Sequence, residues 1–228
     1  MKHWIIPVLS VAFVTLLWLN GPIPQDQGYH HFADQREVGG IPNFMDVITN
    51  LPFLFVGATG LSALRFTRPR SMRRMMVVLS TAFILLTFGS GYYHWEPRDI
   101  TLVYDRVPIA IIILTFFCMI INDHVGEWYG HMLLPPLVLL GIGSVLWWHW
   151  SGDLRPYVLV HYLPILLIPF IIWAYPYRHG RWSEILLAYL FFALARAAEA
   201  LDHVIFQLFR AISPAIPSST CSWPLRDG

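Results

Sequence analysis

Long apolar runs, separated by short polar stretches, dominate the sequence. Seven of these runs approach the roughly 20 residues that a helix needs to cross a bilayer. They cover residues 4–20, 44–64, 75–95, 102–122, 131–150, 157–175 and 183–209. The pattern predicts an all-α, polytopic membrane helix bundle with about seven spans. The first run follows a basic start but lacks the small-residue cleavage pattern of a signal peptide, so we expect it to remain a span.

The composition agrees with a membrane protein and excludes other classes. Apolar residues make up 56% of the 228 and charged residues only 13%, about half of what soluble domains carry. The net charge of +1 gives no reason to expect nucleic acid, so the expected partners are membrane lipids. Cys118 and Cys221 lie in different contexts and suggest no disulfide framework. No internal repeat is evident, which argues against an inverted-repeat transporter.

Arginines predict the orientation of the bundle. The loop after the second run holds five of them, and two more follow two loops later on the same side. Loops rich in Lys and Arg face the cytoplasm. We therefore expect the long segment 21–43 to face outward, together with the ends of the third and fourth runs that carry His94 and Asp105.

A polar group marks the junction of the third and fourth runs. Ser90 and His94 are four residues apart and share a helix face, and Asp105 follows across a short turn. Ionisable groups at membrane depth cost roughly 2.5–3.5 kcal/mol each, so they usually have a function. His94 is a candidate zinc ligand, Asp105 a candidate base, and Ser90 a candidate hydrogen-bond donor to substrate.

A purely structural interpretation of the same group stays open. Ser90 and His94 can satisfy each other, or backbone carbonyls, at the membrane interface. Asp105 can then simply pair with Arg106. Spacing alone does not separate these two interpretations.

A second polar cluster lies in the last run, where Arg196, Glu199, Asp202 and His203 recur at helical spacings. The pairs Arg196–Glu199 and Glu199–His203 are favourable on a helix. Such a cluster must face the bundle interior or mark the helix end in water. The preferred interpretation is a supporting salt-bridge network rather than direct catalysis.

Oxygen-bearing side chains precede and open the second run: Asp34, Glu37, Asn43, Asp46 and Asn50. The last three recur at spacings of three and four, so they can cap that helix or supply oxygen ligands to a cation. Asp34 and Glu37, with the His-His pair before them, could hold a divalent cation. A solvated loop is the preferred interpretation.

These motifs resemble the alkaline ceramidase family, especially its bacterial branch, within the superfamily that includes adiponectin-receptor-like membrane hydrolases. The matching stretches are Tyr-His-His-Phe-Ala-Asp-Gln-Arg at 29–36, Gly-Ile-Pro-Asn-Phe-Met-Asp-Val-Ile-Thr-Asn-Leu-Pro-Phe at 40–53, Ser-Gly-Tyr-Tyr-His at 90–94, Asp-Arg at 105–106 and Glu-Ala-Leu-Asp-His at 199–203. The resemblance divides the chain into a ceramidase-like transmembrane domain, 1–209, and an aberrant tail, 210–228.

The resemblance implies a zinc-dependent intramembrane hydrolase of a bacterial inner membrane that splits ceramide into sphingoid base and fatty acid. His94 is then the first zinc ligand, Asp105 the carboxylate beside the zinc-bound water, and Ser90 its hydroxyl neighbour. Some members of the family bind calcium through an acidic N-terminal segment. The spacing of Asp34, Glu37 and the residues after them does not follow that pattern clearly.

The family's other two zinc ligands come from a His-x3-His pair, typically inside His-Thr-Leu-Lys-His, which this sequence lacks. Its tail is instead polar and rich in proline. Synonymous codons for residues 215–228 can be chosen that, read from the last base of the Ala215 codon, encode His-Thr-Leu-Lys-His-Leu-Gln-Leu-Ala-Ala-Ala-Gly-Trp. We therefore hypothesise a frameshifted tail and impaired activity. The alternatives are a non-catalytic seven-helix lipid sensor and a proton-coupled carrier that uses the acidic cluster of the last run.

Overall fold

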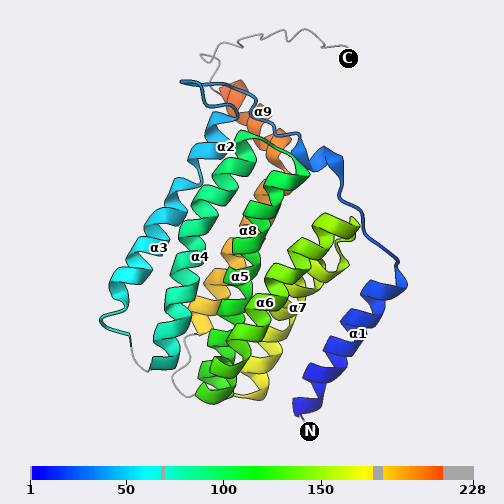
Figure 1. The fold of residues 1–228 in the computed structure, drawn as a ribbon, viewed down its shortest axis with the longest axis vertical. Coiled ribbons are helices and arrows are strands. Elements are labelled where there is room, and N and C mark those ends of the chain that lie inside the picture. The colour runs from blue at the N-terminus through cyan, green and yellow to red at the C-terminus, as the bar shows by residue number, and fades with distance from the viewer. Residues whose placement is uncertain (1, 68–69, 177–181, 213–228) are drawn as a thin grey trace.

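The computed structural model describes residues 2–67, 70–176 and 182–212. Helices occupy most of this part of the chain, and its only β-type pairing is an isolated bridge between Val38 and Ile41. The all-α class predicted from the apolar runs is confirmed. Figure 1 shows the longer helices standing side by side as a bundle.

The α-helices are α1 (Ile5–Leu19), α2 (Phe44–Ile48), α3 (Leu51–Ala63), α4 (Arg70–Trp95), α5 (Asp99–His124), α6 (Glu127–Ser151), α7 (Arg155–Ala174), α8 (Trp182–Ala200) and α9 (Asp202–Ile212). There are also two short 3-10 helices. Helix η1 (Lys2–Trp4) precedes α1, and η2 (Gln27–His30) lies between α1 and α2.

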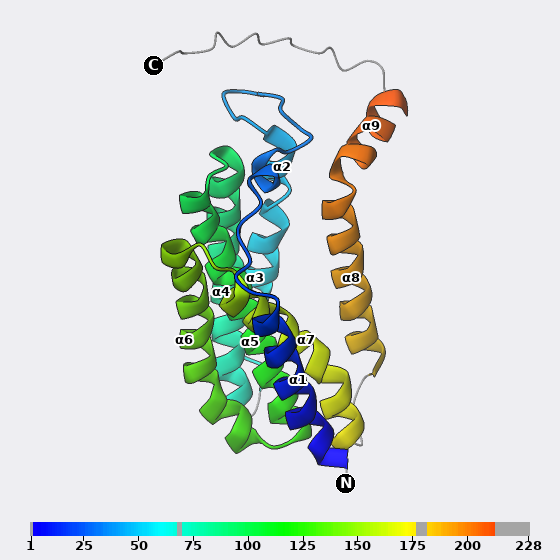
Figure 2. The ribbon, with the colours of Figure 1, turned by 90° about the vertical axis from the view of Figure 1, so that its right-hand side faces the viewer.

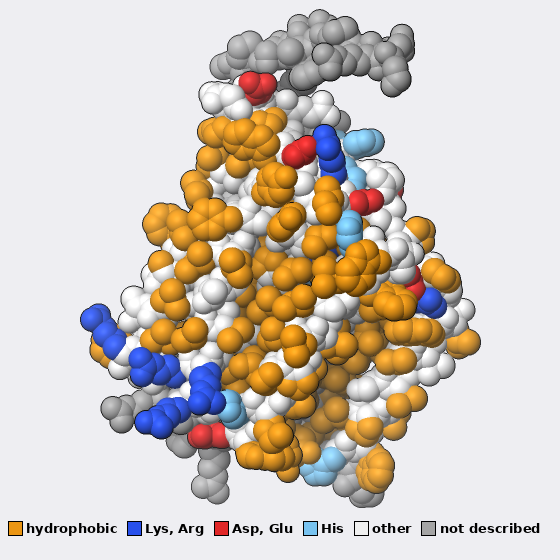
Figure 3. Space-filling view, viewed as in Figure 1, with side chains coloured by type: hydrophobic (Ala, Val, Ile, Leu, Met, Phe, Trp, Pro, Cys, Tyr) orange, Lys and Arg blue, Asp and Glu red, His pale blue; other side chains and the backbone are white. Residues whose placement is uncertain are grey.

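Five helical stretches of the described chain are long and apolar enough to cross a membrane: α2 and α3 taken together, α4, α5, α6 and α7. On the face drawn in Figure 3, hydrophobic side chains cover the middle of the bundle and charged ones gather toward its two ends. The chain is therefore a membrane protein, because only a lipid-facing surface tolerates so much exposed apolar area.

The two remaining expected spans differ from the other five. The first, α1, has only 15 residues. The last expected run, 183–209, is divided, because α8 ends at Ala200 and α9 begins at Asp202. The count of seven spans stays a prediction.

The core of the bundle surrounds α5, which packs against α4, α6 and α7. Leu102 and Leu114 of α5 are almost fully buried, as are Tyr93 of α4 and Trp148 of α6. Membrane helices gain little from the hydrophobic effect against each other, so close packing holds them together. A β-carbon at Gly57 of α3, for example, would lie 2.6 Å from the Ser80 carbonyl oxygen of α4.

The segment between α1 and α2 crosses the end of the bundle where α4 ends and α5 begins (Figure 1). Ile23 begins this crossing, and its carbonyl accepts a 2.8 Å hydrogen bond from the Leu154 backbone N–H just before α7. Gly39 and Gly40, both with positive φ, make the tight turn of the Val38–Ile41 bridge. The long segment 21–43 is thus fixed across the helix ends.

Figure 2 shows α8 and α9 at the edge of the bundle opposite α6. Ile185 and Tyr189 of α8 pack on the apolar cluster that α5 and α7 form, and the Tyr189 hydroxyl donates to the Ile165 carbonyl of α7. The C-terminal helices are therefore joined to the rest of the bundle through α7 and, as described below, through the 21–43 segment.

Candidate active site

The Ser90 and Asp105 side chains meet between α4 and α5. Ser90 is 6% exposed and Asp105 7% exposed. The Ser90 hydroxyl donates a hydrogen bond to the Asp105 carboxylate. The proximity expected from the short turn between the two helices is therefore present.

Glycine and threonine residues around the turn bring the two side chains together. Gly89 precedes Ser90, and a β-carbon there would lie 2.1 Å from the carbonyl oxygen of Tyr104, which precedes Asp105. The start of α5 is fixed by Thr101, whose hydroxyl oxygen accepts a 3.1 Å hydrogen bond from the Arg98 backbone N–H. Close backbone approach at Gly89 thus sets the register in which Ser90 faces Asp105.

His94 lies one helical turn beyond Ser90, in the last turn of α4. Its ring packs against Phe32 of the crossing segment, with centroids 4.6 Å apart. Its Nδ1 is buried and has no hydrogen-bond partner among the described residues. No hydrogen bond joins His94 to Ser90 or Asp105 in this part of the chain, so the mutual pairing of Ser90 and His94 is not what the structure shows.

Arg106 does not act as the ion-pair partner of Asp105. Its Nη2 donates to Gln25 Oε1 at 2.6 Å, and its guanidinium lies 4.1 Å from the Trp148 ring centroid and 5.0 Å from that of Tyr157. Stacking on aromatic faces is a favourable environment for a guanidinium. The purely structural interpretation, in which Asp105 forms an ion pair with Arg106, is therefore wrong.

The polar cluster of the last run is not a network on one interior helix face. Helix α8 ends between its members, so Arg196 and Glu199 belong to α8 and Asp202 and His203 to α9. The Arg196–Glu199 ion pair forms as expected, although both side chains are largely exposed. The Glu199–His203 pair does not form among the described residues, because His203 Nε2 lies 3.2 Å from the His31 carbonyl oxygen instead.

The acidic members of this cluster join the C-terminal helices to the crossing segment. Glu199 is hydrogen-bonded to the Tyr29 hydroxyl, and Asp202 Oδ2 accepts a 2.9 Å hydrogen bond from the Ala33 backbone N–H. Neither placement considered from the sequence describes the cluster alone. It lies at the junction of α8 and α9, and the charges of Glu199 and Asp202 lie close enough to act on Asp105 and His94.

Asp34 serves as a structural clamp within the crossing segment. It is 3% exposed, and its two oxygens accept hydrogen bonds from the Arg36 guanidinium at 2.5 Å and from the Met45 backbone N–H at 3.0 Å. Burial raises the pKa of Asp34, but these hydrogen bonds and the adjacent Arg36 charge outweigh it and hold the pKa below its ordinary value. Both carboxylate oxygens are therefore already engaged within the protein.

The other three candidate calcium ligands are placed differently. Glu37 is exposed, whereas Asp46 Oδ2 is buried and has no hydrogen-bond partner among the described residues. Asn43 has a left-handed backbone with φ of 47°, and its side chain donates to the His94 carbonyl at 2.8 Å. Neither Asn43 nor Asn50 caps a helix with its side chain, so the capping hypothesis is wrong. The Asn50 amide instead donates to the Asp46 carbonyl at 2.7 Å.

Sequence reasoning missed two residues near the site, Tyr29 and His161. Tyr29 bonds Glu199. His30, considered from the sequence only as a cation ligand, has its ring 3.0 Å from both the Tyr93 hydroxyl and Asp99 Oδ1. His161 of α7 is 8% exposed, and neither of its ring nitrogens has a partner among the described residues. Its position inside the apolar run 157–175 was the available signal, since an imidazole there is costly.

The described residues fit part of a zinc site but do not complete one. Zinc takes three or four protein ligands at structural or catalytic sites. His94 offers an unpartnered nitrogen, yet no group of three His, Cys, Asp or Glu side chains within the described ranges could hold a metal ion. Residues 213–228, which include most of the hypothesised frameshifted tail, lie outside the described residues.

Comparison with known proteins adds no assignment to this geometry. The chain matches no protein-family model, no curated protein and no solved structure.

Proposed function

We propose that this chain is the scaffold of a zinc-dependent, intramembrane hydrolase of ceramide-like lipid amides. The sequence as written lacks the His-x3-His pair that supplies the family's other two zinc ligands, so the proposal includes impaired activity. The motif resemblance supplies the substrate class. The observation that supports the proposal most directly is the buried hydrogen bond between Ser90 and Asp105, one helical turn from His94.

The environment of Asp105 differs from that of the structural carboxylates in this protein. Asp34 is paired with Arg36, and Asp153 with Arg155 at 2.7 Å. Asp105 is as deeply buried but is held by a hydroxyl, while the neighbouring guanidinium of Arg106 binds Gln25. Asp105 has no ion-pair partner among the described residues, and an unpaired buried carboxylate is costly, which favours a chemical role over a purely structural one.

The proposed chemistry assigns one task to each side chain. Asp105 takes a proton from the attacking water and later returns one to the leaving amine, as a general base and then a general acid. Ser90 orients Asp105 through their hydrogen bond. Water oxygen adds to the amide carbon and the C–N bond breaks, which releases a fatty acid and a sphingoid base. Zinc held partly by His94 would lower the pKa of its water to about 7 and polarise the amide carbonyl.

The orientation and the membrane belong to the proposal as well. We infer that the arginine-bearing start of α4 faces the cytoplasm of a bacterial cell, on the positive-inside rule. Ser90, His94 and Asp105 would then lie toward the outer face of the inner membrane.

A second candidate function is a lipid sensor that binds a ceramide-like ligand without hydrolysing it. Within the described residues no group of three side chains completes a metal site around His94, which favours this candidate, because one nitrogen holds zinc weakly.

The test compares the given chain with a reframed chain, in which the thirteen-residue peptide that begins His-Thr-Leu-Lys-His replaces residues 216–228. Fatty acid released from ceramide by each purified protein is measured by mass spectrometry. The reframed chain should release fatty acid, and its Asp105→Asn variant should be at least about 100-fold slower, as expected on loss of a general base. A folded reframed chain that binds ceramide but releases no fatty acid would instead support the sensor.

A further inference from the structure

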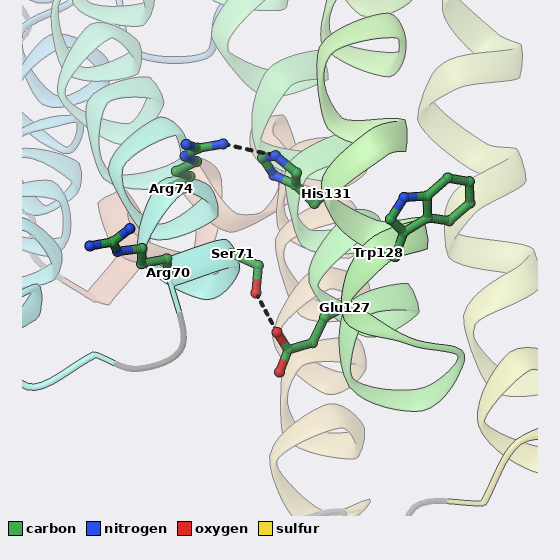
Figure 4. A pocket seen from close by; sticks show the side chains of 6 residues that line it. All are labelled: Arg70, Ser71, Arg74, Glu127, Trp128 and His131. Carbon is green, nitrogen blue, oxygen red and sulfur yellow. Dashed lines mark hydrogen bonds between the residues drawn. The ribbon is translucent and has the colours of Figure 1, made fainter.

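A cavity of about 380 Å³ lies between the starts of α4 and α6, at the opposite end of α4 from His94. Its lining residues are Arg70, Ser71, Arg74, Glu127, Trp128 and His131. Figure 4 shows that they come from only these two helices. At 1.5 Å per residue, the 20 residues from Arg74 to His94 place the cavity roughly 30 Å from the candidate active site.

Two hydrogen bonds between the helices frame the cavity. Arg74 Nη1 lies 2.8 Å from His131 Nε2, and Ser71 Oγ donates to Glu127 Oε2 at 3.3 Å (Figure 4). Because an arginine side chain can only donate hydrogen bonds, His131 Nε2 is the acceptor of this one, and the proton of the neutral ring is on Nδ1. That Nδ1 is buried and has no hydrogen-bond partner among the described residues. The cavity is therefore framed by fixed contacts between the two helices.

The two guanidinium groups of the cavity outnumber its one lining carboxylate, that of Glu127. Neither Arg70 nor Arg74 forms an ion pair with Glu127 or with another described carboxylate, and both arginines are exposed. The first turns of α4 and α6 lie beside the cavity, and the positive ends of their helix dipoles favour an anion. Two guanidinium groups and the positive ends of two helix dipoles together match the negative charge of a phosphate.

We propose that this cavity binds a phosphate group, presented by the headgroup of an anionic phospholipid. It lies beside the exposed Trp128, a residue type that gathers at membrane–water interfaces. Basic pockets between membrane helices are suited to phospholipid headgroups. Figure 3 shows arginine side chains gathered at this same end of the bundle. The site is independent of the proposed hydrolase chemistry.

The test measures binding to the purified full chain in a neutral detergent by the shift of its thermal unfolding midpoint. Short-chain phosphatidylglycerol, short-chain phosphatidylcholine and inorganic phosphate are titrated separately. We expect saturable stabilisation by phosphatidylglycerol and little by phosphatidylcholine. Equal stabilisation by inorganic phosphate would identify a free phosphate as the source of the same chemistry. No saturable stabilisation by either phosphatidylglycerol or phosphate would overturn the proposal.

Three single variants separate a specific site from a general effect of charge. Arg70→Gln and Arg74→Gln each remove a lining guanidinium, whereas Arg73→Gln removes an exposed charge that does not line the cavity. Each lining variant should weaken binding about fivefold, the effect of one basic residue at an anionic lipid. The Arg73 variant should bind within about twofold of the parent, since only screened, distant charge is lost.

An equal loss in all three variants would show diffuse attraction and overturn the site. Arg70 has no hydrogen-bond or ion-pair partner among the described residues, so the Arg70→Gln variant should fold. This variant keeps the test decisive if the Arg74→Gln variant fails to fold.

Discussion

Gly89 of α4 and Tyr104 of α5 approach each other so closely that a β-carbon on the glycine would lie 2.1 Å from the tyrosine carbonyl oxygen. The two residues immediately precede Ser90 and Asp105, which share the buried hydrogen bond of the candidate site. The helix–helix contact and the site are thus consequences of the same backbone approach.

Gly89→Ala should therefore separate α4 from α5 at the site. Backbone atoms cannot rotate away as a side chain can, so we expect a loss of about 1–3 kcal/mol in unfolding free energy, typical of overpacking. Thermal unfolding in detergent measures it. Gly91→Ala is the matched control, because a β-carbon at Gly91 meets nothing within 4 Å. Equal effects of the two substitutions would contradict the close approach.

Ser90→Ala should destabilise the bundle by about 1–3 kcal/mol, because it leaves the buried Asp105 carboxylate without its hydroxyl partner. Ser144→Ala is the comparison. Ser144 is also buried, at 3% exposure, but its hydroxyl donates only to the Gly141 carbonyl of its own helix. We expect Ser144→Ala to cost less than Ser90→Ala in the same unfolding measurement, and the reverse order would argue against a carboxylate held by Ser90.

Substitutions of Asn43 should separate its two roles. Asn43→Gly keeps the left-handed backbone and removes the 2.8 Å hydrogen bond to the His94 carbonyl, which should cost about 0.5–1.5 kcal/mol. Asn43→Ala removes the same hydrogen bond and, unlike the glycine variant, keeps a β-carbon in the left-handed backbone at φ of 47°. It should cost about 1 kcal/mol more than Asn43→Gly. Unfolding midpoints of the two variants measure the difference. An alanine variant as stable as the glycine variant would show that the turn relaxes freely.

The stability that Asp34 contributes should disappear in acid. Its folded pKa lies below the ordinary 3.8, so the stabilisation is complete above that value and is lost as pH falls through the folded pKa. Asp34→Asn should be less stable than the parent at pH 7 by about 1.5–3 kcal/mol, and the gap should close as the pH falls through the folded pKa of Asp34. Unfolding midpoints between pH 7 and 2.5 test this. Glu37→Gln, an exposed carboxylate of the same segment, should follow the parent throughout.

The apolar runs predicted the helices well because each helix must satisfy its backbone within itself in a membrane. The meeting of Ser90 and Asp105 was also predictable, since a short turn brings consecutive helices side by side. The break between α8 and α9 was not, because Leu201, where the helix is interrupted, has no helix-breaking chemistry. The partners of Arg106 and Asp202 lie 81 and 169 residues away along the chain, and no local pattern encodes such contacts.

The zinc content of the given and reframed chains most directly tests whether His94 belongs to the preserved half of a hydrolase site. Both proteins are purified in parallel and analysed for bound zinc by mass spectrometry. The reframed chain should carry close to one zinc per protein, lose it on His94→Ala, and retain it on replacement of the remote His131. The given chain should carry almost none. A folded reframed chain without zinc, or equal zinc in both chains, would contradict the proposed site.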